Sequence, residues 1–133
     1  MLKFKSAGAA IPAQDIKRAR KFYEDKLGLK PTEEQSDGGA AYQLGDTGFV
    51  LFASMGKASG DHTQMALEIE DVAAAVRELQ DKGVAFEEYD YPEFKSRDGV
   101  VDMPDGGKGA WLKDTEGNLI AITSRVPAAA RRS

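Results

Sequence analysis

The sequence predicts an α+β fold: two βαβββ repeats that form a cup-shaped mixed sheet with the helices outside. Two internal similarities indicate the repeats. Residues 9–26 (AAIPAQDIKRARKFYEDK) match residues 65–82 (MALEIEDVAAAVRELQDK) at a spacing of 56. Residues 41–53 (AYQLGDTGFVLFA) match residues 110–122 (AWLKDTEGNLIAI) at a spacing of 69. Each repeat then consists of a strand, a helix and three further strands.

The first repeat is expected at about residues 4–54. Its helix follows Asp15, whose side chain is suited to cap the first free backbone N–H groups, and ends before Gly28, where a left-handed residue is favoured. Between these positions apolar residues recur on one face at the helical period of 3.6 residues. The expected elements are a strand at 4–13, a helix at 15–27, and strands at 31–36, 39–45 and 48–54.

The second repeat is expected at about residues 64–125. It begins with a strand in which polar and apolar residues alternate, and its helix lies between Asp71 and Gly83. The turn residues in DTEGN predict a hairpin between its last two strands. The expected elements are a strand at 64–70, a helix at 72–82, and strands at 84–90, 108–113 and 118–124.

The increase in spacing from 56 to 69 places about 13 additional residues between Gly83 and Gly109. The segment YDYPEFKSRDGVVDMPDGGK, residues 89–108, is rich in glycine, proline and aspartate, and we predict a long loop there. Its aromatic and basic side chains are suited either to close over a ligand or to cover a dimer edge. Within it we expect Tyr91 and Phe94 to contact a ligand.

The composition excludes several classes of function. The chain has 133 residues, 41% of them apolar, which is enough for a hydrophobic core, and no cysteine, which excludes disulfides, thiolate metal sites and a cysteine nucleophile. The formal net charge of −4 does not favour nucleic acid as a partner. No apolar run is long enough for a signal peptide or a membrane span. We therefore expect a soluble, cytoplasmic protein with a flexible tail at 126–133.

The stretch DIKRARKFYEDKLGL, the turn DTEGNLIAI and the duplicated strand order resemble the vicinal oxygen chelate superfamily, which includes glyoxalase I, bleomycin-resistance proteins and extradiol dioxygenases. The resemblance covers residues 4–125 and implies a single domain over 1–125. In metal-using members, histidines and carboxylates from the first and last strands of each repeat hold a divalent ion. The matching positions offer at most one weak amide donor, and they are Gly8, Phe52, Gln64 and Ala121. The resemblance therefore implies neither a metal nor another cofactor here.

Alternation along an extended strand places His62, Gln64 and Glu68 on one face, opposite an apolar face that suits helix packing. His62 is the only histidine, and a metal centre would need at least two further ligands near it. It therefore fits the rim of a ligand site or a solvated junction better than a metal ligand. Glu68 is suited to accept a hydrogen bond from a ligand or to act as a base, or else to pair with a nearby Lys or Arg.

Three aromatic residues outside the long loop are candidates for contact with a planar ligand, with the core as their alternative: Tyr42, Phe52 and Trp111. Tyr42 and Trp111 occupy matched positions in the two repeats. We therefore predict that both face the interior of the cup or that neither does.

Two functions from different classes fit these features. The first is metal-independent binding of a small, partly planar organic ligand, in a homodimer by resemblance to the bleomycin-resistance proteins, and it needs no catalytic residue. The second is a lyase, isomerase or dioxygenase with a displaced metal site, or with Glu68 and a tyrosine as acid and base. The sequence favours binding because it contains no obvious set of oxyanion donors. A regulatory protein that acts through its dimer surface is a third possibility.

Overall fold

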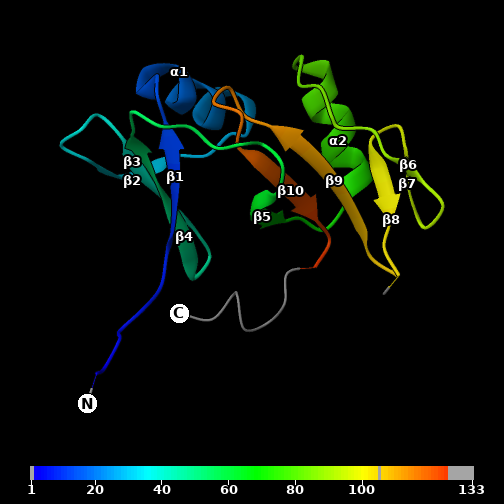
Figure 1. Cartoon of the computed structure of the whole chain (residues 1–133), viewed down its shortest axis with the longest axis horizontal. Coiled ribbons are helices and arrows are strands. Elements are labelled where there is room, and N and C mark those ends of the chain that lie inside the picture. Colours follow the sequence, from blue (N-terminus) through cyan, green and yellow to red (C-terminus); the bar gives the residue numbers. More distant parts are fainter. Residues whose placement is uncertain (1, 105, 126–133) are drawn as a thin grey trace. The chain divides into compact units, whose positions relative to one another are not determined.

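The computed structural model describes residues 2–104 and 106–125, which form two compact units on either side of the Lys57–Ala58 bond (Figure 1). Each unit contains one of the predicted repeats and combines a helical segment with a mixed sheet. The predicted α+β class is therefore confirmed. The tail predicted at 126–133 lies outside the described residues. Within the described ranges, no helix has the length and apolar character needed to cross a bilayer.

The first unit begins with strand β1 (Ala9–Ala13) and helix α1 (Ile16–Lys21), which continues as a π-helical turn, η1 (Phe22–Lys26). Strands β2 (Pro31–Glu34), β3 (Ala40–Leu44) and β4 (Thr47–Ala53) follow. The strand order is β1-β4-β3-β2, with β1 parallel to β4 and the other neighbours antiparallel. The side chain of Asp15 caps α1 as predicted, because it accepts a hydrogen bond from the backbone N–H of Arg18 at 3.1 Å.

One face of this sheet forms the core of the first unit together with the helical segment. The side chains that alternate onto this face are buried, and they are Ile11, Ala13, Ala40, Tyr42, Phe49 and Leu51. The ring centroids of Tyr23, Tyr42 and Phe49 lie 5.1 to 6.2 Å apart. The hydroxyl of Tyr42 donates a hydrogen bond of 2.7 Å to Glu24 of η1. Tyr42 therefore belongs to the core that links sheet and helix.

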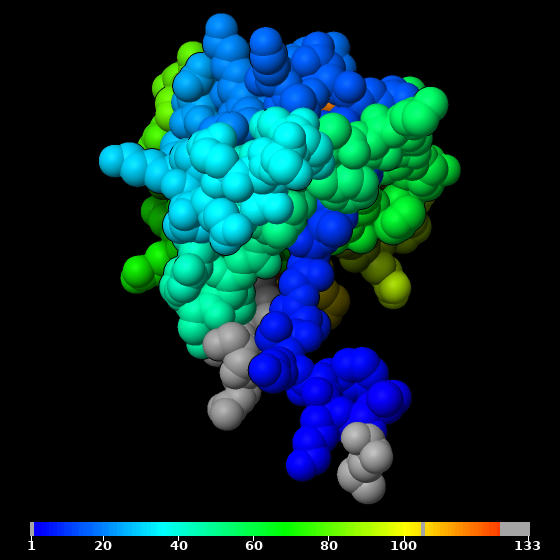
Figure 2. All heavy atoms as spheres, turned by 90° about the vertical axis from the view of Figure 1, so that its left-hand side faces the viewer, coloured from blue at the N-terminus to red at the C-terminus, as the bar shows by residue number. Residues whose placement is uncertain are grey.

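The first strand is shorter than predicted, because β1 begins at Ala9 rather than at residue 4. Ala9 pairs with Phe49, and β4 itself begins only two residues earlier, at Thr47. Residues 2–6 therefore extend past the end of the strand that could pair with them. Leu2 and Phe4 are 79% and 88% exposed, and the N-terminal segment stands clear of the rest of the first unit (Figures 1 and 2).

The second unit contains β5 (Thr63–Glu68), α2 (Val72–Asp81), β6 (Asp90–Tyr91), β7 (Phe94–Arg97), β8 (Val100–Asp102), β9 (Lys108–Lys113) and β10 (Leu119–Thr123). The strand order is β5-β10-β9-β8-β7-β6, with β5 parallel to β10. As predicted, Asp71 caps the helix by accepting from the backbone N–H of Ala74 at 3.0 Å. Helix α2 covers the face that carries Leu112, Ile120 and Ile122, which are buried.

The predictions of a strand at 84–90 and a long loop at 89–108 are wrong. The edge position beside β9 is divided between two segments. Phe86 bridges to Leu112 at one end of β9, and β8 pairs with its other end through Val101 and Gly109. Between them, residues 88–100 leave the edge and return as the hairpin β6–β7 and the start of β8. We call residues 88–100 the inserted hairpin.

The prediction that Tyr42 and Trp111 face the same way is also wrong. In the first unit, Leu44 pairs with Thr47 across a loop of two residues, whereas in the second unit Lys113 pairs with Leu119 across a loop of five residues. The two loops thus differ in length by three residues, which shifts the strand pairing by an odd number of positions. Because side chains alternate along a strand, an odd shift in pairing turns a matched residue to the opposite face. Tyr42 consequently lies on the helix-covered face of its sheet, and Trp111 lies on the face opposite α2.

Candidate ligand-binding site

Three aromatic side chains gather in the second unit and form what we call the aromatic cluster: Tyr89, Phe94 and Trp111. The ring centroids are 5.1 Å apart for Tyr89 and Phe94, 5.3 Å for Phe94 and Trp111, and 5.7 Å for Tyr89 and Trp111. The interplanar angles of 66°, 59° and 89° place the rings edge to face or tilted, which are favourable arrangements. The inserted hairpin thus brings two of its rings onto a ring that projects from β9.

The indole of Trp111 is held in one orientation from two sides. Its Nε1–H donates a hydrogen bond of 2.9 Å to Oγ1 of Thr63 at the start of β5. At Gly109, two residues earlier on β9, an added Cβ would lie only 3.1 Å from Cη2 of the indole. The absence of a side chain there allows the ring to lie along its own strand. The polar group of Trp111 is therefore satisfied within the protein, and its ring is available for apolar contact.

The inserted hairpin is fixed by the hydroxyl of Ser96. This oxygen accepts a hydrogen bond of 2.7 Å from the backbone N–H of Tyr89 and also contacts the carboxylate of Glu88. The backbone N–H of Ser96 in turn donates to the carbonyl of Tyr89 at 2.8 Å. Burial, and next the charge of Glu87, raise the pKa of Tyr89. The Tyr89 phenol therefore stays neutral at physiological pH, where a neutral phenol can donate a hydrogen bond but is a poor base.

Small side chains lie beside Trp111 on the same face of the sheet, and of these Ala121 is buried and Ala66 is exposed. Trp111 pairs with Ala121, and Ala121 pairs with Ala66, so that these three side chains project from the same face of adjacent strands. Glu68, two residues beyond Ala66 on β5, projects from this face as well. The result is an apolar strip across three strands that has a carboxylate on one side and the aromatic cluster on the other.

The expected alternation of His62, Gln64 and Glu68 does not hold. Thr63 pairs with Leu119 but Met65 pairs with Ile120, so Gln64 is the extra residue of a β-bulge. Gln64 is half-buried, and its Oε1 is buried with no hydrogen-bond partner among the described residues. His62 lies in the turn before β5 and is exposed. Of the three residues, only Glu68 is assigned by the strand register to the face that carries Trp111.

Two further expected contact residues, Tyr91 and Phe52, are described by their own strands. Tyr91 is 62% exposed and pairs with Phe94 across the β6–β7 hairpin. Phe52 lies in β4 of the first unit, half-buried, on the face opposite the core that contains Tyr42. The structure thus brings together Trp111 and Phe94 from the expected set and adds Tyr89. The two-residue turn Asp98–Gly99 between β7 and β8 is a sequence signal for paired strands rather than a loop here, but no local signal indicates that Tyr89 contacts the other two rings.

The donor set does not fit a divalent metal at the positions that the resemblance indicates. Gly8 precedes β1, while Phe52 and Ala121 carry hydrocarbon side chains. The amide of Gln64 is the single donor of the four. Over residues 2–104 and 106–125, no three His, Asp or Glu side chains gather as a metal-binding group.

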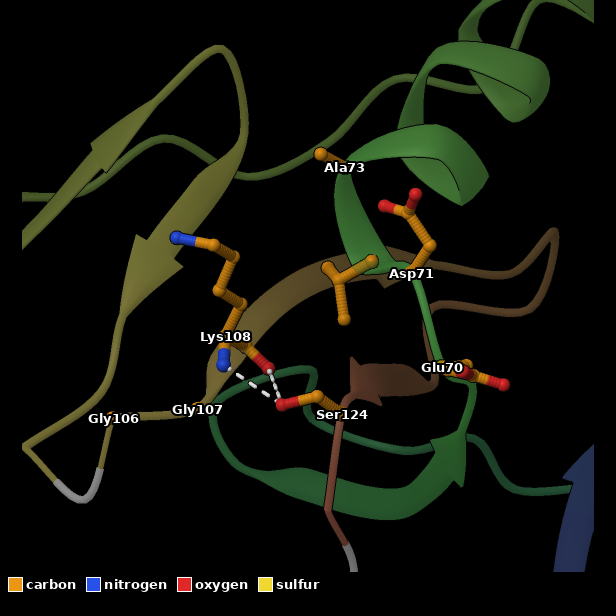
Figure 3. A pocket seen from close by; sticks show the side chains of 8 residues that line it. Glu70, Asp71, Ala73, Gly106, Gly107, Lys108 and Ser124 are labelled. Carbon is orange, nitrogen blue, oxygen red and sulfur yellow. Dashed lines mark hydrogen bonds between the residues drawn. The ribbon is translucent and has the colours of Figure 1, made fainter.

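A separate open hollow of about 420 Å³ lies at the start of α2 (Figure 3). Its lining combines Glu70 and Asp71 with Lys108, Ser124 and two glycines. The side chain of Asp71 already accepts from the helix N-terminus, and Lys108 forms an ion pair with Asp102. The hydroxyl of Ser124 accepts from the backbone N–H of Lys108 at 2.9 Å. Because Asp71, Lys108 and Ser124 already have hydrogen-bond or ion-pair partners, the hollow is a weaker candidate site than the aromatic cluster.

Solved structures with this fold include both binding proteins and an enzyme. UcmS2 superimposes with a TM-score of 0.72 at 20% identity, over 93% of this chain and all of that one. A bleomycin-binding protein in complex with bleomycin gives 0.67 at 22% identity, over 92% and 100% of the two chains. Lactoylglutathione lyase from Agrobacterium tumefaciens gives 0.67 at 15% identity, over 92% and 94%.

No curated protein sequence matches the chain significantly. A family model does match, and it extends over residues 6–122, which include both repeats, the inserted hairpin and all three rings of the aromatic cluster. The chain therefore belongs to the glyoxalase/bleomycin resistance protein/dioxygenase superfamily.

Proposed function

We propose that this protein binds a small, partly planar organic molecule on the aromatic cluster and the adjoining apolar strip, without a metal ion and without altering the ligand. The observation that supports this most is the aromatic cluster itself. The indole of Trp111 is held by its hydrogen bond to Thr63, the backbone of Tyr89 is held by Ser96, and the three rings pack against one another, so that little rotamer freedom is lost on binding. A ligand ring that covers about 100 Å² of apolar surface would gain about 2.5 kcal/mol from burial alone.

The bleomycin-binding protein among the structural relatives supports the choice of binding as the function. An enzyme is the second candidate, and it is favoured by the carboxylate of Glu68 on the face that carries Trp111. The raised pKa of Tyr89 argues against that tyrosine as its base, because the phenol resists ionisation. The proposal further includes a homodimer in the cytoplasm, and light scattering of the purified protein would test the dimer.

The single tryptophan of the chain makes the proposal directly testable, because all tryptophan fluorescence arises within the aromatic cluster. Titration with fused-ring quinones should quench this fluorescence saturably and raise the melting temperature as ligand concentration increases. Phe94→Ala should weaken binding at least about tenfold through the loss of one ring. Treatment with a chelator should leave the affinity unchanged, and mass spectrometry should recover the ligand unmodified.

A matched control is Phe4→Ala, which also removes an aromatic side chain, but one that is 88% exposed in the N-terminal segment. It should leave the affinity unchanged. Equal losses in the two variants would count against a site on the aromatic cluster. Turnover of the ligand by wild type that disappears in Glu68→Gln would favour the enzyme instead.

A further inference from the structure

The negative charge of the chain is concentrated in the unit that contains the aromatic cluster. Residues 58–126 hold 15 acidic and 7 basic side chains, a net charge of −8, whereas the rest of the chain holds 7 acidic and 11 basic side chains, a net charge of +4. The two values add to the overall −4. The moderate total charge therefore conceals a strongly acidic unit, whose field attracts cations and repels anions.

The acidic side chains come close to the rings of the aromatic cluster. Residues 87–93 (EEYDYPE) place four carboxylates in the segment that contains Tyr89. The backbone N–H of Glu87 donates to the carbonyl of Trp111 at 2.8 Å, which brings Glu87 next to the cluster. Glu68 projects from the same face as Trp111.

Two basic side chains of this unit lie beside carboxylates, and one of these carboxylates, Asp90, belongs to the segment 87–93. The ammonium group of Lys95 lies 3.9 Å from Asp90, and Lys108 is paired with Asp102. The side chain of Lys113, which shares the face of Trp111, lies beside Gly60 in the segment before β5.

The rings themselves favour the same sign of charge. The faces of Trp, Tyr and Phe carry negative electrostatic potential, and an organic cation gains energy when it lies over them within about 6 Å. In the aromatic cluster each edge-to-face contact covers one face of one ring, so the contacts among the three rings leave their other faces uncovered by the cluster itself. A flat cation can thus use apolar contact, ring faces and carboxylates together, whereas a neutral ligand of the same shape can stack on the rings but carries no charge for the carboxylates to attract.

We propose that the aromatic cluster selects ligands that combine a planar ring with a permanent positive charge, in preference to neutral and anionic ligands of the same shape. This inference rests on the proposed function, since it specifies the ligand class of the same surface. The ring stacks on the cluster, and the charged substituent lies toward Glu87 or Glu68.

Three anthraquinones with one scaffold test the selection, carrying a trimethylammonium, a hydroxymethyl or a sulfonate substituent. Affinities from Trp111 fluorescence and calorimetry should favour the cation over the neutral probe about tenfold, with the anion weakest. The preference should shrink as salt rises from about 0.02 to 0.5 M, because salt screens exposed charges. Equal affinities for all three probes would overturn the charge selection and leave the proposed function intact. Failure of every probe to bind would overturn both.

Charge-neutralising variants test which carboxylates cause the preference for the cationic probe. Glu87→Gln and Glu68→Gln should each weaken binding of the cationic probe severalfold while the neutral probe binds as before. Glu78→Gln is the matched control, because it removes the same charge from the exposed side of α2, where Glu78 pairs with Lys82. A loss in Glu78→Gln as large as in the other two variants would mean that only net charge matters, and would refute a site-specific preference.

Discussion

Replacement of Tyr42 by phenylalanine should destabilise the protein without affecting ligand binding. Tyr42 is 1% exposed, and its hydroxyl donates a hydrogen bond of 2.7 Å to the carboxylate of Glu24. Hydrogen bonds to charged groups contribute about 1.5–3 kcal/mol, and Glu24 keeps its second bond, 2.8 Å from Arg20. We therefore expect a loss of about 2 kcal/mol at pH 7, equivalent to a melting temperature lower by about 6–10 °C in a chain of this size.

The same bond predicts how this difference varies with pH. Burial, and then the hydrogen bond to Glu24, raise the pKa of Tyr42 above its unfolded value of 10.0. The folded state therefore holds the proton more tightly, so the stabilisation is complete below pH 10 and is lost as pH rises toward the folded pKa. Above pH 10 the gap between wild type and Tyr42→Phe should narrow by about 1.4 kcal/mol per pH unit.

Urea unfolding followed by far-ultraviolet circular dichroism from pH 7 to 11 measures both effects. Tyr91→Phe is the matched control, because Tyr91 is 62% exposed, and its stability should stay within about 0.5 kcal/mol of wild type. A Tyr42→Phe variant as stable as this control at pH 7, or a gap that stays constant through pH 11, would refute the placement of Tyr42 in the core.

Three further substitutions test the second unit. Thr63→Val removes the acceptor of the Trp111 indole N–H. Because this bond is exposed, the free energy of unfolding should fall by at most about 1 kcal/mol, while the tryptophan emission shifts and planar ligands bind more weakly. Gly109→Ala should displace the indole by a few tenths of an ångström and alter the same emission, since the added Cβ would lie 3.1 Å from it, and an unchanged spectrum would contradict this packing. Asp114→Ala should cost about 3 kcal/mol in urea unfolding, because this buried carboxylate accepts two backbone N–H groups of its turn at 2.8 and 2.9 Å, and Asp114→Asn should cost less.

The elements that depend on local chemistry could be predicted from the sequence. Asp15 and Asp71 cap helices because a short carboxylate accepts from nearby backbone N–H groups, and this needs no knowledge of the tertiary fold. The duplicated pattern correctly indicated two units of strand, helix and further strands. The turn between β7 and β8 could also have been predicted, because Asp-Gly is a common hairpin signal. The structure has this two-residue turn at Asp98–Gly99, with positive φ values of 54° and 82°.

The features that depend on strand register could not be derived in this way. The bulge at Gln64 is defined only by its pairing with β10, and nothing in the local sequence distinguishes it from regular alternation. Tyr42 and Trp111 face opposite ways because the loops that follow their strands have two and five residues. An ungapped alignment of the two repeats does not show this difference in loop length. For the candidate site, the sequence supplied Trp111, Phe94 and Glu68 as candidates, but the contact of Tyr89 with both other rings required the fold.

The inserted hairpin has a structural consequence for how this surface could be changed. The chain leaves the edge of β9 at Glu87 and rejoins it at Val101, so the intervening segment can be exchanged while both flanking attachments are kept. A hairpin of different length or side chains, spliced between the same two points, would replace two of the three rings and leave the strands beneath them as they are. Related proteins can thus differ in the ligand that they recognise by exchange of this one short segment, while the strands that support it stay the same.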